Sequence, residues 1–211
     1  MIRDFFKCSI LLVVAACSIA PEIPLQPLPV PAMEKLPVHV ALVTDDAFRN
    51  FEFDGPLKSP MDVHTTEGGG TLHYELGKMN VDLFNQVADS LFAQVTRFDS
   101  MEELKASGDL FDGVLVPAVA HFDAGSTIGS IYPSIFANVT YELLFYDQNE
   151  MAILHWNVVS QQLICKDVTW CHDGYKTIMP LVEREIAAKI LSQFPEFPEI
   201  TDWVKSVESG R

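Results

Sequence analysis

Hydrophobic and polar positions alternate along this chain with two different periods, and each period marks a type of element. A short run rich in β-branched residues predicts a first strand over 38–44. Over 78–95 the apolar residues return every three or four positions, with Asn, Gln, Asp and Ser between them. This spacing predicts a long helix with one buried face. Residues 45–71 read as irregular, with 48–53 extended, and 72–76 as another short strand.

The middle of the chain combines short elements with one strongly apolar strand. Residues 96–99 read as a short strand, and Ser100 and Glu103 have the spacing of a capping box before a brief helix over 101–107. The apolar run 113–122 predicts a central strand. Pro117 lies inside it and indicates a bulge or an edge position. Glycines and a proline predict a loop over 123–133.

The second half predicts a hairpin followed by a helix. Over 134–146 the apolar residues alternate, and one face carries Val139, Tyr141, Leu143 and Phe145. A turn at 148–149 leads to a returning strand over 150–160, and a cysteine-bearing loop follows over 161–173. A second long helix spans 174–193. Because proline fits only the first turn of a helix, Pro180 suggests a start near Met179. A short helix is expected around Trp203.

This order of elements predicts an α/β fold of α+β mixed type. We expect a single mixed β-sheet with two long helices packed on one face. The first strand–helix–strand unit should be parallel and right-handed. No internal repeat is visible, and residues 38–211 read as one domain.

The first residues have the pattern of an export signal. A basic start with Arg3 and Lys7 precedes a short apolar run, which is too short to span a bilayer. The run ends in Val14-Ala15-Ala16-Cys17, which resembles a bacterial lipobox. The resemblance implies removal of 1–16 and acylation of Cys17, which anchors the protein in a membrane. The proline-rich stretch 17–37 then reads as an extended tether.

The composition excludes some partners. The net charge of −15 argues against nucleic acid and against wide contact with anionic lipid, because both require a basic surface. It is typical of a solvated acidic surface, and it also suits a basic protein partner. Hydrophobic residues make up 48% of the chain, which is enough for a core of ordinary size.

The four cysteines separate by position. Cys8 leaves with the signal and Cys17 carries the lipid, so Cys165 and Cys171 form an even pair outside the cytoplasm. We expect a disulfide between them, since oxidising compartments permit one. On the loop-entropy model such a short loop stabilises by about 2–3 kcal/mol. A metal site beside His172 is the alternative, but the segment lacks the second ligand pair of a zinc module.

Candidate chemistry is sparse. The histidines have no zinc-binding spacing, and His39, His121 and His155 fall on predicted strands. His64 and His73 flank a glycine run with Glu67 and Glu75 nearby, where a metal or acid–base site is the less expected alternative. Asp45 and Asp46 follow the first strand and are expected to cap a turn. We predict no catalytic residue, no metal and no cofactor. An exposed aromatic patch of Phe48, Phe51 and Phe53 is the expected binding surface.

The lipobox at 14–17, the strand 38–44, the segment 83–95 and the strand 112–122 together resemble small periplasmic domains of bacterial lipoproteins. Examples are the activators of penicillin-binding proteins, the curli-secretion lipoprotein, the auxiliary lipoproteins of ABC-type export systems and the N-terminal domain of the Tol-system propeller protein. Ser18 stands where an aspartate often signals inner-membrane retention. The resemblance therefore implies a lipid-anchored outer-membrane protein that faces the periplasm.

Three functions fit these observations. The first is a non-catalytic interaction or assembly factor with an envelope protein partner. The second is a small-molecule or lipid-binding auxiliary of a transport system, which needs an enclosed apolar pocket between helix and sheet. The third is a hydrolase or metal enzyme, which needs clustered histidines and carboxylates.

Overall fold

The computed structural model describes residues 18–19, 27–28, 33–56, 71–127, 134–165 and 171–210. The elements follow the chain in this order: β1 (Ser18–Ile19), β2 (Leu36–Val43), α1 (Asp46–Arg49), β3 (Glu52–Pro56), β4 (Thr71–Glu75), α2 (Gly77–Leu91), β5 (Phe92–Phe98), α3 (Met101–Ser107), β6 (Gly113–Thr127), β7 (Ser134–Asp147), β8 (Ala152–Cys165), α4 (Cys171–Gln193), η1 (Phe194–Glu196) and α5 (Pro198–Gly210).

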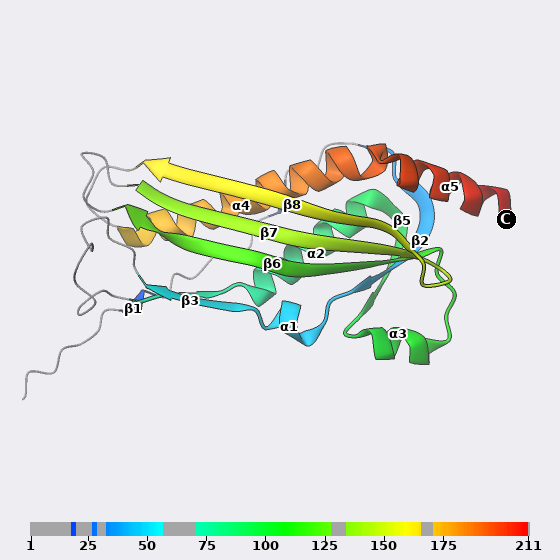
Figure 1. Ribbon diagram of the computed structural model, residues 1–211, viewed down its shortest axis with the longest axis horizontal. Helices are drawn as coiled ribbons and strands as arrows, with labels where there is room; N and C mark the ends of the chain where they lie inside the picture. Colours follow the sequence, from blue (N-terminus) through cyan, green and yellow to red (C-terminus); the bar gives the residue numbers. More distant parts are fainter. Residues whose placement is uncertain are drawn as a thin grey trace, which may run out of the picture.

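The main sheet is mixed, as the sequence predicts. Its strand order is β5-β2-β6-β7-β8. β2 lies between β5 and β6 and is parallel to both, whereas β7 lies between β6 and β8 and is antiparallel to both. Figure 1 shows α2 and α4 along the same side of the long strands. The predicted α/β class and the two long helices on one face are therefore confirmed.

The alternation of side chains in β2 supplies both faces of this sheet. Val38, Val40 and Leu42 enter the main core between the sheet and the two long helices. The same core holds one face of β7 and one face of each long helix. β7 contributes Val139, Tyr141, Leu143 and Phe145. α2 contributes Leu83, Phe84, Val87, Ala88 and Leu91, and α4 contributes Ile178, Val182, Ile186 and Ile190. The predicted apolar faces of these three segments are thus confirmed.

A smaller cluster lies on the opposite face of the sheet. Ala41 and Val43 of β2 and Val114 of β6 pack there with Phe98, Leu104 and Phe111. α3 covers this cluster and contacts β2 and β5. Ser100 caps α3 by accepting a hydrogen bond from the backbone N–H of Glu103 (3.1 Å), as the capping-box spacing predicts. Gly108, with φ of 68°, ends the helix in the left-handed conformation that glycine adopts without strain.

A second, three-stranded sheet has the order β1-β4-β3, and the prediction of a single sheet is incomplete without it. It packs on the main sheet through aromatic side chains, since the rings of Phe53 of β3 and Tyr74 of β4 both contact the ring of Phe122 of β6. Ser18 pairs with Thr71 of β4, and Leu28 donates a 2.8 Å backbone hydrogen bond to Gln86 of α2. These described parts of the predicted tether therefore lie against the domain rather than apart from it.

Two helix boundaries differ from the prediction. The helix expected over 78–95 ends at Leu91, and β5 follows at once because Phe92 already has extended backbone (φ −113°, ψ 147°). Parallel pairing with β2 from Phe92 to Phe98 outweighs the helical pattern there. α4 begins at Cys171 and contains Pro180 in its interior. Buried neighbours on both sides, Ile178 and Val182, hold the helix against the sheet despite the missing hydrogen bond.

Three segments predicted as irregular are regular. β6 continues to Thr127 and β8 to Cys165, because β7 offers each a pairing partner along its whole length. Phe48 lies in α1 and not in an extended segment. β6 pairs with β2 only as far as Leu115, so beyond that point its β2 side is an edge. Pro117 lies in this part of β6 and pairs with β7 alone in the main sheet. Because proline has no N–H to donate, this is the edge position that it favours.

Candidate functional site

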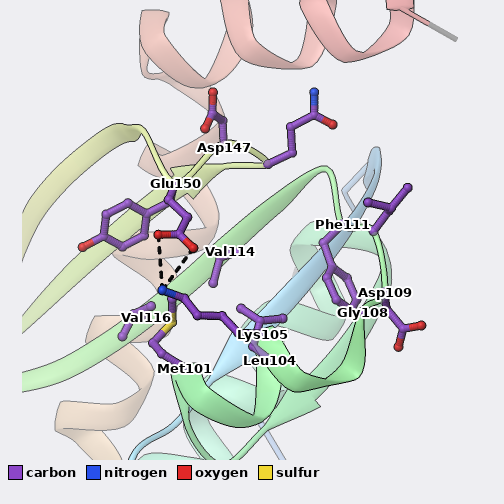
Figure 2. A pocket seen from close by; sticks show the side chains of 13 residues that line it. Met101, Leu104, Lys105, Gly108, Asp109, Phe111, Val114, Val116, Asp147 and Glu150 are labelled. Atoms are coloured by element: carbon purple, nitrogen blue, oxygen red, sulfur yellow. Dashed lines mark hydrogen bonds and ion pairs between the residues drawn. The ribbon is translucent and has the colours of Figure 1, made fainter.

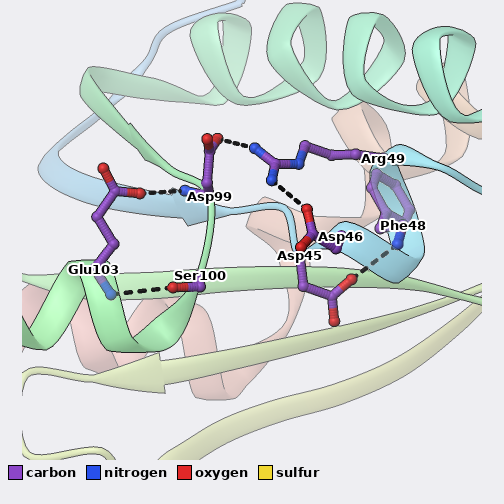
Figure 3. A network of polar contacts seen from close by, with 7 residues as sticks. All are labelled: Asp45, Asp46, Phe48, Arg49, Asp99, Ser100 and Glu103. Atoms are coloured by element: carbon purple, nitrogen blue, oxygen red, sulfur yellow. Dashed lines mark hydrogen bonds and ion pairs between the residues drawn. The ribbon is translucent and has the colours of Figure 1, made fainter.

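The polar residues at the carboxyl ends of β2 and β5 form a structural network, which Figure 3 shows in detail. Asp45 caps α1 by accepting a 2.8 Å hydrogen bond from the backbone N–H of Phe48, so its predicted capping role is confirmed. Arg49 pairs with both Asp46 and Asp99. The hydrogen bond with Asp99 raises the pKa of Arg49 above its ordinary value most strongly, and that with Asp46 adds to the effect. Every charge named here already has a structural partner.

The predicted aromatic binding surface is wrong. Phe48 is only 2% exposed and packs against Phe84 and Tyr141 in the main core. Phe51 and Phe53 are half-buried, and both contact the ring of Phe122. These side chains attach α1 and the small sheet to β6. They cannot serve as an exposed docking patch.

Three histidines of the described strands are hydrogen-bonded rather than clustered, and His121 of β6 is exposed. His39 lies 2.9 Å from the Thr96 hydroxyl, and His155 lies 2.5 Å from Glu142. His73 contacts Asp54, its cross-strand neighbour, at 2.8 Å. Within the part of the chain that the structure describes, no three His, Cys, Asp or Glu side chains are grouped to hold a metal ion.

A groove lies beside α3, on the face of the sheet opposite the long helices (Figure 2). Its volume is about 520 Å³. The floor is apolar and half-buried or buried, and it consists of Met101, Leu104, Phe111, Val114, Val116 and Tyr146. Three segments build it, namely α3 with the loop after it, the start of β6, and the end of β7 with its turn. This size lies within the range of pockets that hold small molecules or side-chain anchors.

The rim of this groove carries charge and one isolated apolar side chain. Lys105 of α3 reaches across to Glu150 in the β7–β8 turn, with 3.1 Å between Nζ and Oε1 (Figure 2). Asp109 and Asp147 also line it. Leu110 stands at the rim with 91% of its surface exposed. Three carboxylates against one ammonium make the rim acidic.

Glu150 has an unusual backbone conformation. Its φ is 61°, in the left-handed region that costs a residue with a side chain about 1–2 kcal/mol. Its ion pair with Lys105 is exposed on both sides, and such pairs stabilise by only about 0–1 kcal/mol. The ion pair therefore does not offset the cost of a glutamate where glycine or asparagine fits better.

A buried polar cluster lies in the main core, away from the groove. Tyr141 donates a 2.6 Å hydrogen bond to Oδ1 of Asn80, and Glu183 of α4 is buried near Tyr141. Burial raises the pKa of Glu183 to about 8, with repulsion from Asp82 adding to the effect and Arg184 opposing it. Burial also raises the pKa of Tyr141 above its ordinary value. Because this cluster is enclosed, it does not offer a site to a ligand from solution.

Several predicted positions lie outside the described residues. Cys17, with the signal segment, and His64 are among them. The backbone places Cys165 at the end of β8 and Cys171 at the start of α4, but the side chains of this predicted disulfide are not described. In the parts of the chain that are described, no helix combines the length and apolar character needed to cross a bilayer.

The groove is the feature that the sequence analysis missed. Its floor residues read as ordinary core positions, and its rim residues as surface charges. Leu110 is the available signal, since it stands beside Phe111 in the short stretch 107–112 between a predicted helix and a predicted strand, where an apolar residue has no periodic pattern to explain it. Glu150 gives a second signal because it follows the turn residues of the hairpin.

Comparison with known proteins shows the fold and no family. No model of a known protein family matches the sequence, and no curated protein does either. Among solved structures, protein XCC0632 from Xanthomonas campestris, assigned to DUF330, superposes with a TM-score of 0.50 at 11% identity, covering 93% of this chain and 100% of that one.

Two further structures resemble parts of the chain more weakly. A neuraminyllactose-binding hemagglutinin homolog from Helicobacter pylori has a TM-score of 0.43 at 12% identity, covering 86% of this chain and 96% of that one. A minor lipoprotein from Acinetobacter baumannii has a TM-score of 0.38 at 10% identity, covering 74% of this chain and 88% of that one. At these identities the likeness to XCC0632 extends to the fold, and the weaker two carry no argument about function.

Proposed function

We propose that this protein is a lipid-anchored protein of the bacterial outer membrane that faces the periplasm and acts by binding a protein partner, without catalysing a reaction. The groove beside α3 is the observation that carries the binding role. It combines an apolar floor with the 91% exposed side chain of Leu110, and an exposed apolar side chain at a groove favours protein contact.

The anchoring part of the proposal rests on the sequence. Val14-Ala15-Ala16-Cys17 supplies the small residues and the cysteine of a lipobox. Replacement Cys17→Ser is the direct test, followed by fractionation of the cells. We expect the variant to leave the membrane fraction, and unchanged retention would contradict the lipid anchor. Cys8→Ser is the matched control, because Cys8 lies within the segment that is removed.

Partner binding is tested by crosslinking in intact cells. A photo-crosslinking amino acid at Leu110 should give a product with one defined partner. The same amino acid at Leu163, which is 63% exposed near the far end of β8, serves as the control. We expect the product with the first variant alone. Equal products at both positions, or none at Leu110, would contradict a binding role for the groove.

The groove also supports a second candidate function, a small-molecule or lipid-binding auxiliary of an envelope transport system. A volume of about 520 Å³ between α3 and the sheet is large enough for part of an acyl chain or a small ligand. Native mass spectrometry of protein extracted from membranes separates the two functions. A stoichiometric bound ligand that Val116→Trp expels would favour the second.

We propose in addition that Cys165 and Cys171 form a disulfide in the periplasm. β8 ends at Cys165 and α4 begins at Cys171, so the bond would join the two elements across their short connection. Alkylation with and without reductant tests this. Free thiols in protein taken from the periplasm would contradict it.

A further inference from the structure

We infer that the groove beside α3 binds a protein segment in which an apolar side chain is flanked by lysine or arginine. This inference deepens the proposed function and rests on it. It depends on the juxtaposition of an apolar floor with an acidic rim.

The floor defines the apolar part of the occupant. Leu104, Phe111 and Val114 are each less than 10% exposed and form a continuous surface below the rim. A polar side chain entering this space would lose its contacts with water and find few hydrogen-bonding groups in return. A leucine, methionine or phenylalanine side chain would bury its surface at no such cost.

The rim defines the charge of the flanking residues. Figure 2 shows Asp109 on one side of the groove and Glu150 on the other. Asp147 adds negative charge nearby, while its Oδ1 accepts hydrogen bonds from the backbone N–H groups of Asn149 and Met151. Lys105 neutralises one carboxylate, and its pair with Glu150 is exposed (57% and 63% of the side chains) and therefore exchangeable. Cationic side chains on both sides of an apolar anchor would meet carboxylates, whereas anionic ones would meet like charge.

The hairpin turn fixes the position of Glu150. Its backbone N–H donates a 3.1 Å hydrogen bond to the carbonyl oxygen of Asp147, and its φ of 61° is the left-handed conformation that such a turn uses. The turn therefore holds the Glu150 carboxylate at the edge of the groove. The overall charge of −15 adds long-range attraction for a basic protein.

The experiment measures fluorescence anisotropy of two labelled peptides with the full chain in phosphatidylcholine nanodiscs. One peptide is Gly-Ser-Lys-Leu-Phe-Lys-Ser-Gly, and the other has glutamate in place of both lysines. We expect the lysine peptide to bind at least about tenfold more tightly, with affinity that falls as salt is raised. Equal affinity for the two peptides, or no binding of either, would overturn the inference.

Variants assign the binding to the groove. Glu150→Gln should lower the affinity for the lysine peptide about two- to fivefold. Val114→Asp should abolish binding, and circular dichroism checks that the variant folds. Glu102→Gln is the matched control, since Glu102 lies on α3 but does not line the groove. An equal loss with Glu102→Gln would overturn the assignment.

The outcomes also separate this inference from the proposed function. If the crosslinker at Leu110 captures a partner in cells but the peptides bind equally, the inference fails and the binding function stands. If the peptides differ as expected but Leu110 captures nothing in cells, the charge preference of the groove stands and the proposed function fails.

Discussion

The hydroxyl of Tyr141 donates a 2.6 Å hydrogen bond to Oδ1 of Asn80 and so joins the centre of β7 to the first turn of α2. Both side chains are buried, with exposed fractions of 1% and 0%. Within the described structure, Nδ2 of Asn80 has no hydrogen-bond partner. Of the two polar atoms of the Asn80 side chain, Oδ1 is therefore hydrogen-bonded, through the hydroxyl of Tyr141, and Nδ2 is not.

Tyr141→Phe should lower the free energy of unfolding by about 1–3 kcal/mol, because it leaves Oδ1 of Asn80 buried without its donor. Urea denaturation monitored by circular dichroism measures this. Tyr146→Phe, at a half-buried position on the opposite face of β7, is the control, and we expect a change within about 0.5 kcal/mol. Equal effects of the two variants would contradict the role of the Asn80 contact.

Glu183 should make the fold less stable as pH rises. Its pKa is about 8 in the folded protein and near 4.5 in the unfolded chain. Between these values the folded state retains a proton that the unfolded state has released. The free energy of unfolding then falls by up to about 1.4 kcal/mol per pH unit from this group.

Glu183→Gln removes this slope, so the variant should gain stability relative to the parent at pH 8.5 and much less at pH 5. Urea denaturation at the two pH values measures it. Glu199→Gln, at an exposed position of α5, should leave the slope unchanged. Parallel pH dependence of the Glu183 variant and the parent would show that this carboxyl is not the source.

Gly77→Ala should destabilise the protein strongly. A Cβ at this position would lie 1.8 Å from the backbone carbonyl oxygen of Arg49, which a side-chain rotation cannot relieve. We expect a loss of about 1–3 kcal/mol or more in thermal or urea denaturation. Gly210→Ala, where nothing lies within 4 Å, should be neutral. A neutral result at Gly77 would mean that α1 moves away from α2 without cost.

Glu150→Gly should stabilise the fold by about 1 kcal/mol, because glycine adopts the left-handed conformation freely. The increase in melting temperature measures this. A decrease would show that the ion pair with Lys105 outweighs the backbone cost. Lys105→Gln, which breaks that pair without changing the backbone, gives the value of the pair by itself.

His73 should titrate above its ordinary pKa of 6.5, because its ring is hydrogen-bonded to Asp54 on the neighbouring strand. The stabilisation from this pair is complete below about pH 6.5 and is lost as pH rises through the raised pKa. NMR titration of the ring protons measures the pKa. Asp54→Asn should return it toward 6.5, and an unchanged value would assign the shift to other charges.

The sequence correctly predicts those elements whose hydrophobic pattern fits only one type of secondary structure. The alternation over 134–146 and the Ser100 cap both indicate one structure, and β7 and α3 form where expected. The segment 92–95 has two readings, since Phe92 and Val95 fit either a helix face or a strand. Pairing with β2 decides it, and that contact is not visible in the local pattern.

The groove could not be predicted for a similar reason. Leu104, Val114 and Tyr146 lie on three elements, and only the order β2-β6-β7 of the sheet brings these elements together. The prediction of an exposed patch at Phe48, Phe51 and Phe53 is wrong because these residues lie in a segment that the sequence pattern indicates as irregular, and irregular segments are usually exposed. Asp45 in fact starts a helical turn that directs Phe48 inward.

The pairing of Ser18 with Thr71 fixes how the proposed lipoprotein would stand on its membrane. Cys17 directly precedes Ser18, so acyl chains attached there would enter the bilayer beside the small sheet. Figure 1 places β1 and β3 toward one end of the long axis, and α3 toward the other. Because β7 has 14 residues, its span is about 45 Å. A partner would therefore be met well away from the lipid headgroups, and soluble periplasmic segments could reach the groove more readily than segments embedded in that same bilayer.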